Sequence, residues 1–327
     1  MTHARGTPPR PPFWCPFPAR PHPLAAQLVD GSARWARDMG LAASSTVFAD
    51  TALPRGVSGL GPYLDPAGGA GTAQLASDFV EWSFALEAAA RQDFSRPDVE
   101  DFPALAQRLL GVLQRPGARG AGGGPLPRAL ADLSRRVERL HPSAVDAWTA
   151  RVRNHVVARR WEYGCRSRHG VPGFGHYVTR RRSGIAALCV LTLPRRSDPG
   201  LGSSATLAAR RLALAAVDVI GLDHDVALYP LVLRSGPFPL NAATCIERHE
   251  GHPWDVAIYR TVQRRDEIMA AFVRGCEFLD RRADTALRST LSRLRDCVSG
   301  HIAWLRRSGL PRLPPRPRCA ADAVDDW

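Results

Sequence analysis

Hydrophobic residues recur along most of this chain at steps of three and four, the spacing that places side chains on one face of an α-helix. Helices of this kind bury their apolar faces against one another. No stretch of useful length alternates between apolar and polar residues, as a half-buried strand would. The pattern predicts an all-α fold, a single-domain α-helical bundle. The helical stripes are Leu126, Leu130, Leu133, Val137 and Leu140; Val145, Trp148, Val152 and Val156; Trp254, Ile258, Val262, Met269, Phe272, Cys276 and Leu279; and Leu287, Leu291, Leu294, Val298, Ile302 and Leu305.

One predicted helix, around Leu212 to Leu233, is apolar on almost every side. A helix of that composition is expected at the centre of the fold rather than on its surface. Buried carboxylates are costly unless they are paired or bind a metal, so polar residues here indicate a functional site. The polar residues of this helix are Asp218, Asp223, His224 and Asp225.

Segments rich in glycine and proline separate these stretches, because proline removes an amide donor and restricts the residue before it. The predicted loops cover residues 50–71, 115–127 and 194–204. The ends of the chain are rich in proline and arginine. We therefore expect an extended N-terminal strap (1–23), one helical domain (24–310) and a disordered tail (311–327).

Composition allows one large globular domain. The 327 residues are 45% hydrophobic and 23% charged, which permits a sizeable core. The formal net charge of +13 would attract phosphates and diphosphates, and all 44 basic residues are arginine. These arginines are scattered, and no zinc finger or aromatic RNA-binding motif is present. We therefore expect no nucleic-acid partner.

The seven cysteines are odd in number, widely spaced and form no C-x-x-C pair, which argues against a disulfide framework or a structural zinc site. A reducing, cytoplasmic location fits this pattern. The longest apolar run, Ile185–Leu193, is too short to span a bilayer, and the first residues lack the apolar core of a signal peptide.

Several short motifs occur in a characteristic order between Phe13 and Trp304. They are Phe13-Trp14-Cys15-Pro16-Phe17-Pro18 with His22-Pro23; Trp35 with Met39-Gly40-Leu41; Trp161-Glu162, Val171-Pro172 and Tyr177; Arg180-Arg181-Arg182-Ser183-Gly184; and Gly221-Leu222 through Asp225, with Gly236 and Asn241. In order and spacing, this set resembles the bacterial class I terpene synthases. The resemblance implies the class I terpenoid synthase fold and a prenyl diphosphate, or another apolar small molecule, as the ligand.

In that family, magnesium ions and arginines stabilise the diphosphate that leaves the substrate. The magnesium ligands come from two facing helices, which typically carry DDxxD and NDxxSxxxE. Magnesium prefers oxygen ligands in octahedral geometry. Here the first motif is Glu87 to Arg91, with an arginine at its last acidic position, and the second runs from His224 to Val232. The surviving metal candidates are Glu87, Asp225 and His224, so the resemblance implies a degenerate site and a doubtful magnesium requirement.

The resemblance also assigns roles to residues outside the two metal motifs. Arg180 falls at the position of the diphosphate-sensing arginine, and Ser183 and Gly184 fall at the linker and effector positions. These three are the candidate catalytic residues. Diphosphate binding is expected from Arg180, Arg181 and Arg91. The candidate pocket residues are Phe79, Trp82, Phe84 and Trp304.

Two functions remain open on the sequence. One is an atypical terpene cyclase that ionises a prenyl diphosphate, with arginines replacing part of the missing magnesium charge. The other is a catalytically inactive protein of the same fold that binds an isoprenoid, another apolar ligand or a protein partner. Two further motifs are weaker. His249-Glu250-Gly251-His252 lacks the spacing of a helical zinc motif, and Asp223-His224-Asp225-Val226 only partly matches the acidic motif of protonation-initiated cyclases.

Overall fold

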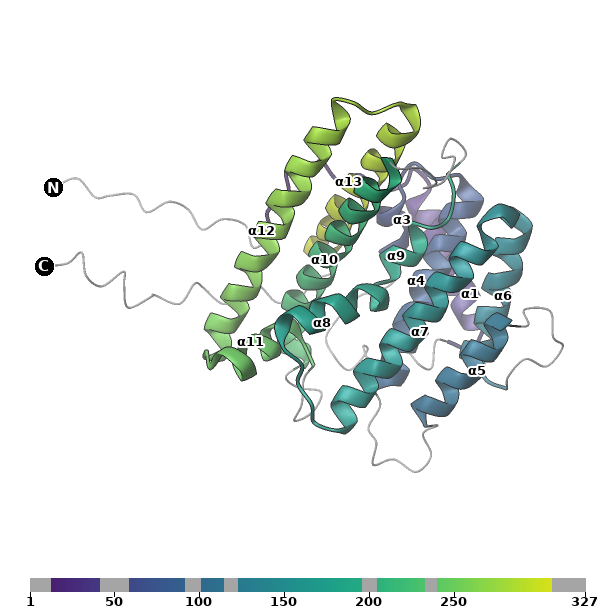
Figure 1. The fold of residues 1–327 in the computed structure, drawn as a ribbon. Coiled ribbons are helices and arrows are strands. Elements are labelled where there is room, and N and C mark those ends of the chain that lie inside the picture. The colour runs from purple at the N-terminus through teal and green to yellow at the C-terminus, as the bar shows by residue number, and fades with distance from the viewer. Residues whose placement is uncertain are drawn as a thin grey trace, which may run out of the picture.

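The computed structural model describes residues 13–41, 59–91, 101–114, 123–195, 205–232 and 240–307, and within these ranges it contains helices and no strand. The predicted all-α fold is confirmed (Figure 1). The helices are α1 (Ala25–Asp38), α3 (Gly61–Leu64), α4 (Ala70–Arg91), α5 (Phe102–Gln114), α6 (Pro125–Leu140), α7 (Val145–Ser167), α8 (Phe174–Arg181), α9 (Ala186–Val190), α10 (Ala205–Val232), α11 (Ala242–Glu250), α12 (Trp254–Asp280) and α13 (Thr285–Arg307), with short 3-10 turns η1 (Pro142–Ala144) and η2 (Arg182–Gly184).

The four hydrophobic stripes correspond to α6, α7, α12 and α13. Two of the predicted loops are shorter than expected. Helix α3 and the first two residues of α4 lie within residues 59–71, and α6 begins at Pro125. In α3 and α6 a proline occupies the first or second helical position, where its missing amide hydrogen is not needed. The prediction from glycine and proline content therefore made both loops too long.

Helix α10 is at the centre of the bundle, as its composition predicted. It packs against α12 and α13 on one side and contacts α8, α9, η2 and α11 on others. Val217 and Val219 are fully buried. Figure 1 shows α11 and α12 at one side of the bundle and α5 and α6 at the other. Functional groups on α10 therefore face the interior rather than solvent.

The short helix α3 lies between α4 and α13 because two glycines permit close approach. A Cβ atom on Gly61 would overlap Ser77 of α4, and one on Gly300 of α13 would overlap the backbone of Tyr63. Helix α3 and the residue before it place Leu60 and Leu64 against the central cavity described below. The close packing thus supplies part of the wall of that cavity.

The described part of the predicted strap docks on the last two helices. Arg265 Nη1 of α12 donates to the Trp14 carbonyl at 2.6 Å, and Ser299 Oγ of α13 donates to the Pro18 carbonyl at 3.1 Å. Residues 1–12 and 308–327, which include the whole of the predicted tail, lie outside the described ranges. The proposed domain boundaries stay predictions.

Among the described residues no helix is long and apolar enough to cross a membrane. Six of the seven cysteines fall in the described ranges, and these six are free thiols. Cys319 lies outside those ranges. Burial of most of these thiols fits their apolar surroundings.

Asp223 and Arg265 form a fully buried ion pair between α10 and α12. Arg265 Nε donates to Asp223 Oδ1 at 2.6 Å, and Nη2 donates to Oδ2 at 3.2 Å. The same guanidinium holds the strap through Trp14. One side chain therefore fixes the spacing of two helices and the path of the N-terminal segment.

We predict that Arg265→Ala lowers the free energy of unfolding by about 3–5 kcal/mol, because it leaves the Asp223 carboxylate buried without a partner. Urea denaturation followed by circular dichroism measures this change. The matched control is Arg260→Ala on the exposed face of α12, which should change stability by less than about 0.5 kcal/mol. Equal losses in the free energy of unfolding for the two substitutions would show that the buried ion pair stabilises the fold no more than an exposed arginine does.

Candidate active site

Glu87 on α4 lies at the first acidic position of the degenerate motif, and two arginines bind its carboxylate. Arg91 Nη2, one turn further along α4, is 2.7 Å from Glu87 Oε1. Arg159 Nη2 of α7 is 2.8 Å from Glu87 Oε2. Both carboxylate oxygens are therefore engaged, and the side chain is buried.

Arg159 connects this carboxylate to two further elements. Its Nη1 is 2.8 Å from Oε2 of Glu162, which lies one turn along α7. Its Nη2 donates to the backbone carbonyl of Gly184 in η2 at 2.6 Å. Arg166 of the same helix approaches Glu162 at 3.7 Å. A single guanidinium thus joins α4, α7 and the kinked segment that follows α8.

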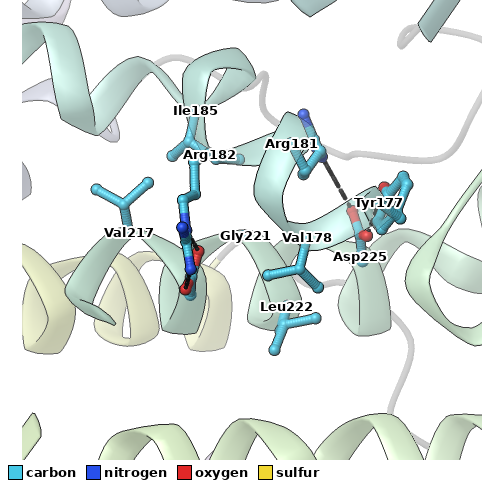
Figure 2. A pocket seen from close by; sticks show the side chains of 10 residues that line it. Tyr177, Val178, Arg181, Arg182, Ile185, Val217, Gly221, Leu222 and Asp225 are labelled. Carbon is cyan, nitrogen blue, oxygen red and sulfur yellow. Dashed lines mark hydrogen bonds and ion pairs between the residues drawn. The ribbon is translucent and has the colours of Figure 1, made fainter. Parts of the chain in front are cut away.

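Asp225 on α10 is held from three directions. Tyr177 Oη donates to Asp225 Oδ2 at 2.6 Å, and the Ala242 amide donates to the same oxygen at 3.1 Å. Arg181 is 3.4 Å from Oδ1 through its Nε. Figure 2 shows Tyr177 and Arg181 converging on this carboxylate from α8. Arg181 Nη1 also reaches Glu162 Oε1 at 3.3 Å, which links the α10 carboxylate to the Arg159 group.

These contacts form one buried ionic cluster. The cluster contains Glu87, Glu162 and Asp225 with Arg91, Arg159, Arg166 and Arg181. Four guanidinium groups therefore face three carboxyl groups.

The pKa shifts within this cluster follow the balance between burial and charge. Burial raises the pKa of Glu87, but Arg159 and Arg91 outweigh it and hold that pKa well below its usual range. Burial lowers the pKa of Arg181, but Glu162 and Tyr177 outweigh it and raise the value well above the ordinary one. Glu87 is therefore ionised and Arg181 is charged at neutral pH.

The ionic cluster closes one end of a small central cavity, whose volume is about 30 Å³. Glu87, Arg159 and Arg181 line the cavity at that end. The remaining wall is mainly apolar and also carries two imidazoles. It is formed by Leu60, Leu64, Ser83, Phe84, Gly184, Ile185, Ala186, Ala187, Ile220, His224 and His301. This volume is well below the ~300–1,000 Å³ of small-molecule sites, so the side chains of the wall must move apart to admit a prenyl chain.

Of the four predicted pocket aromatics, one lines this cavity and a second contacts that lining residue. Phe84 lines it, and Trp304 stacks on Phe84 with ring centroids 6.2 Å apart. Phe79 and Trp82 pack instead against each other and against His155, on the side of α4 that faces α7. Trp82 Nε1 donates to the Leu126 carbonyl at 3.0 Å. These two rings belong to the core between helices rather than to the cavity wall.

The predicted arginine pair divides between surface and interior. Arg180 is exposed, and its Nε contacts His176 Nε2 at 3.4 Å. Arg181, the next residue, is buried and lines the cavity. The Ser183 carbonyl accepts from His155 Nδ1 at 3.0 Å, and the Gly184 carbonyl is bound by Arg159. In the described structure the Gly184 carbonyl, predicted to be the effector, therefore points at a guanidinium.

The described residues do not fit a magnesium cluster. No group of three or more His, Cys, Asp or Glu side chains with metal-binding geometry occurs within the described ranges. Both Glu87 oxygens are bound by arginine, and both Asp225 oxygens have partners. The remaining candidate, His224, offers a nitrogen, whereas magnesium prefers oxygen. We therefore derive no step through a metal ion.

Four residues at the site were not among the predicted site residues: Arg159, Glu162, His155 and His301. The spacing of Arg159, Glu162 and Arg166, at three and four residues along one helix, is a recognisable signal for side chains that pair. Nothing in the sequence distinguishes His155 and His301 from ordinary core histidines. Their positions become evident only when α4, α7 and α13 are packed together.

Comparison with known proteins identifies the class. The family model described as "Terpene synthase family 2, C-terminal metal binding" matches residues 78–271. That span covers more than half of the chain and includes most of α4 and all of α7, α8 and α10. The chain belongs to terpene synthase family 2.

Named relatives cover most of this chain. Bonnadiene synthase from Allokutzneria albata is 27% identical over an alignment of 308 residues, which covers 89% of this chain and 83% of that protein. A (+)-T-muurolol synthase from Roseiflexus castenholzii, described as cyclizing (2E,6E)-farnesyl diphosphate, is 26% identical over an alignment of 301 residues. That alignment covers 88% of this chain and 90% of that protein.

Solved structures confirm the predicted class I terpenoid synthase fold. The linalool/nerolidol synthase of Streptomyces clavuligerus superposes with a TM-score of 0.70 at 18% identity, covering 90% of this chain and 99% of that one. A variant of cucumene synthase gives a TM-score of 0.71 at 23% identity, covering 91% and 99%. At these identities the likeness establishes the fold alone.

The buried imidazole of His155 makes stability depend on pH. Its Nδ1 donates to the Ser183 carbonyl and its Nε2 accepts from Ser83 Oγ at 2.9 Å. Burial, and secondarily the charge of Arg159, lower its pKa from 6.5 to about 3. Between these two values the unfolded chain binds more protons than the folded one. This group's contribution to stability is therefore lost as the pH falls below 6.5.

We predict that His155→Gln weakens the pH dependence of unfolding. The free energy of unfolding of the variant minus that of wild type should increase by about 1 kcal/mol for each pH unit below 6. The reason is that one titrating site changes the free energy of unfolding by up to ~1.4 kcal/mol per pH unit. Urea denaturation at pH 7.5, 6.0 and 5.0 measures this difference. His176→Gln, at an exposed position, is the control. A constant difference between His155→Gln and wild type at all three pH values would contradict the prediction.

Proposed function

We propose that this chain is a terpene cyclase, a carbon–oxygen lyase that ionises a prenyl diphosphate and guides closure of the resulting carbocation. Membership of terpene synthase family 2 supports this proposal. The relatives with printed activities are synthases, which favours the enzyme over an inactive protein of the same fold.

One observation carries the proposal: the cavity is charged at one end and mainly apolar along the rest of its wall. A prenyl diphosphate has the same division, with an anionic head and a hydrocarbon tail. The guanidinium groups of Arg159 and Arg181 lie at the charged end. Guanidinium–phosphate hydrogen bonds are charge-assisted and strong, which fixes the direction in which the substrate enters.

The reaction begins when the bond between the allylic carbon and the diphosphate oxygen breaks. The electron pair leaves with diphosphate, and the hydrocarbon becomes a carbocation. Arg159 and Arg181 stabilise the charge that develops on the departing oxygens, and Arg91 and Arg166 add further positive charge nearby. The ring of Phe84 forms part of the apolar wall, where it stabilises a cation, and Trp304 stacks on that ring.

We further propose that guanidinium groups supply most of the charge that magnesium supplies elsewhere in the family. The engaged oxygens of Glu87 and Asp225 support this view. The family description nevertheless refers to metal binding, so magnesium dependence is the property to measure. Within the cluster, a bound diphosphate would compete with Glu162 and Glu87 for the same arginines. Its arrival therefore rearranges Arg159 and Arg181 and frees the Gly184 carbonyl.

The proposal is tested by incubating the protein with geranyl, farnesyl and geranylgeranyl diphosphates, in EDTA and in magnesium. Hydrocarbon products and released diphosphate are both measured. We expect turnover of at least one substrate. Arg181→Gln should reduce it by about 10²–10³-fold, because removing one preorganised donor to a developing oxyanion has that effect.

The matched control is Arg180→Gln, at the neighbouring exposed position, which should keep turnover within about three-fold of wild type. Arg181→Lys keeps the charge and separates loss of catalysis from loss of folding, which circular dichroism checks. Failure to release diphosphate from all three substrates would refute the cyclase. Loss of turnover in Arg180→Gln together with normal turnover in Arg181→Gln would show that Arg180, rather than Arg181, binds the diphosphate.

A further inference from the structure

Helix α3 lies at the end of the central cavity that is remote from the ionic cluster. Leu60 and Leu64 line the cavity there, and Gly61 between them packs against Ser77 of α4. Glu87, at the charged end, follows Ser77 by ten residues on the same helix. At a rise of 1.5 Å per residue, these two levels are about 15 Å apart. The two leucines therefore form the floor of the cavity, opposite the charged end.

The floor has little room to move outward, because α3 is in close contact with its neighbours. A Cβ atom on Gly61 would overlap the backbone of Ser77, and one on Gly300 of α13 would overlap the backbone of α3. The N-terminal strap covers a third side, since the His22 amide donates to the Pro62 carbonyl at 2.9 Å. Helix α3 is therefore held between α4, α13 and the strap.

A second group of buried charges anchors the end of α3. Asp65, the residue directly after this helix, is 1% exposed. Arg195 Nε donates to Asp65 Oδ1 at 2.5 Å, and Arg293 Nη2 of α13 lies 3.5 Å from Oδ2. Arg293 also donates to the carbonyls of Val190 and Leu193, at 2.7 and 2.6 Å, where α9 ends. These contacts tie α3 to α13 and to the segment that follows α9, through charged side chains that do not line the cavity.

The wall beside the charged end is held by different contacts. The Gly184 carbonyl is bound by Arg159, and Arg181 pairs with Glu162. Under the proposed function, a bound diphosphate competes for these same two guanidinium groups, so its arrival loosens this wall. It leaves the ion pairs of Asp65 in place. The cavity of about 30 Å³ must widen to hold a prenyl chain, and it therefore widens near the charged end rather than at the floor.

We propose that Leu60 and Leu64 are specificity-determining residues, which stop the far end of the hydrocarbon and set the longest prenyl chain that the site accepts. This inference rests on the proposed cyclase function. The arginines fix the diphosphate, and each longer substrate of the prenyl series adds one isoprenoid unit at the opposite end. A chain that is one unit too long meets two buried leucine side chains on a helix that is held in place.

Truncation of these leucines should open usable space. Leu→Ala removes an isopropyl group, and two such groups together are slightly larger than one isoprenoid unit. In a wall that can collapse, neighbouring side chains would refill part of the cavity that is left. The contacts of Gly61, Gly300 and Asp65 hold α3 against such collapse. The added space therefore remains available to the substrate.

The test is the chain-length preference of Leu64→Ala and of the double variant Leu60→Ala/Leu64→Ala. Diphosphate release gives kcat/KM for geranyl, farnesyl, geranylgeranyl and geranylfarnesyl diphosphates. The next substrate longer than the best one of wild type should gain about ten-fold or more relative to that best one, because a single methylene too many in an apolar pocket already costs about that much. Leu64→Phe should instead disfavour the longest substrate that wild type accepts, by about ten-fold.

The matched control is Leu130→Ala on α6. This leucine is fully buried, loses the same isopropyl group and does not line the cavity, so the substitution should leave the chain-length preference unchanged. Melting temperatures check that each variant is folded. Leu64→Val is a smaller truncation, which should shift the preference in the same direction if the alanine variants misfold.

The inference would be overturned if the folded Leu64 variants kept the wild-type preference, or if wild type accepted all four chain lengths equally. An equal shift in Leu130→Ala would also overturn it, since general loosening of the core would then be the cause. Dissociation constants of the same four diphosphates, measured by calorimetry, test the floor without turnover. If wild type released no diphosphate, the cyclase function would fail, and the length dependence of binding would still decide whether the leucines limit the chain.

Discussion

The guanidinium of Arg159 is the group on which the site depends. Its contacts with Glu87, Glu162 and the Gly184 carbonyl join α4, α7 and η2 into one unit. Without it, Glu87 would keep only Arg91, which lies on its own helix, and the link through this carboxylate from α4 to α7 and η2 would be lost. The cavity exists because these elements are held apart at this distance, with charge at one end and hydrocarbon-like side chains along the rest.

The same principle recurs along α10, where each buried aspartate has an arginine from another element. Asp218 accepts two hydrogen bonds from Arg182, Asp223 pairs with Arg265, and Asp225 pairs with Arg181. Buried ion pairs of this kind fix geometry more than they add stability. Two of the three arginines come from the α8–η2 segment. The central helix and the kinked segment beside the cavity are therefore positioned by charge as well as by packing.

The hydrophobic stripes were sufficient to predict the helices and the central place of α10, because apolar periodicity directly encodes which face is buried. The site was harder to predict. Arg180 and Arg181 are adjacent in the sequence, but successive residues on a helix point about 100° apart, and only Arg181 faces inward. Similarly, Phe79 and Phe84 lie on one helix yet face different neighbours. His224 and His301 come together only through the way α10 meets α13, which no local pattern specifies.

The central claim is that arginines, rather than a metal cluster, hold the diphosphate at the charged end of the cavity. The most direct test is titration of wild-type protein with inorganic diphosphate by isothermal calorimetry, in EDTA and in millimolar magnesium. The account predicts that diphosphate binds in EDTA with a dissociation constant within about three-fold of the value in magnesium, and that binding weakens with added salt. Binding should disappear in Arg159→Gln. Binding that occurs only with magnesium would contradict the account.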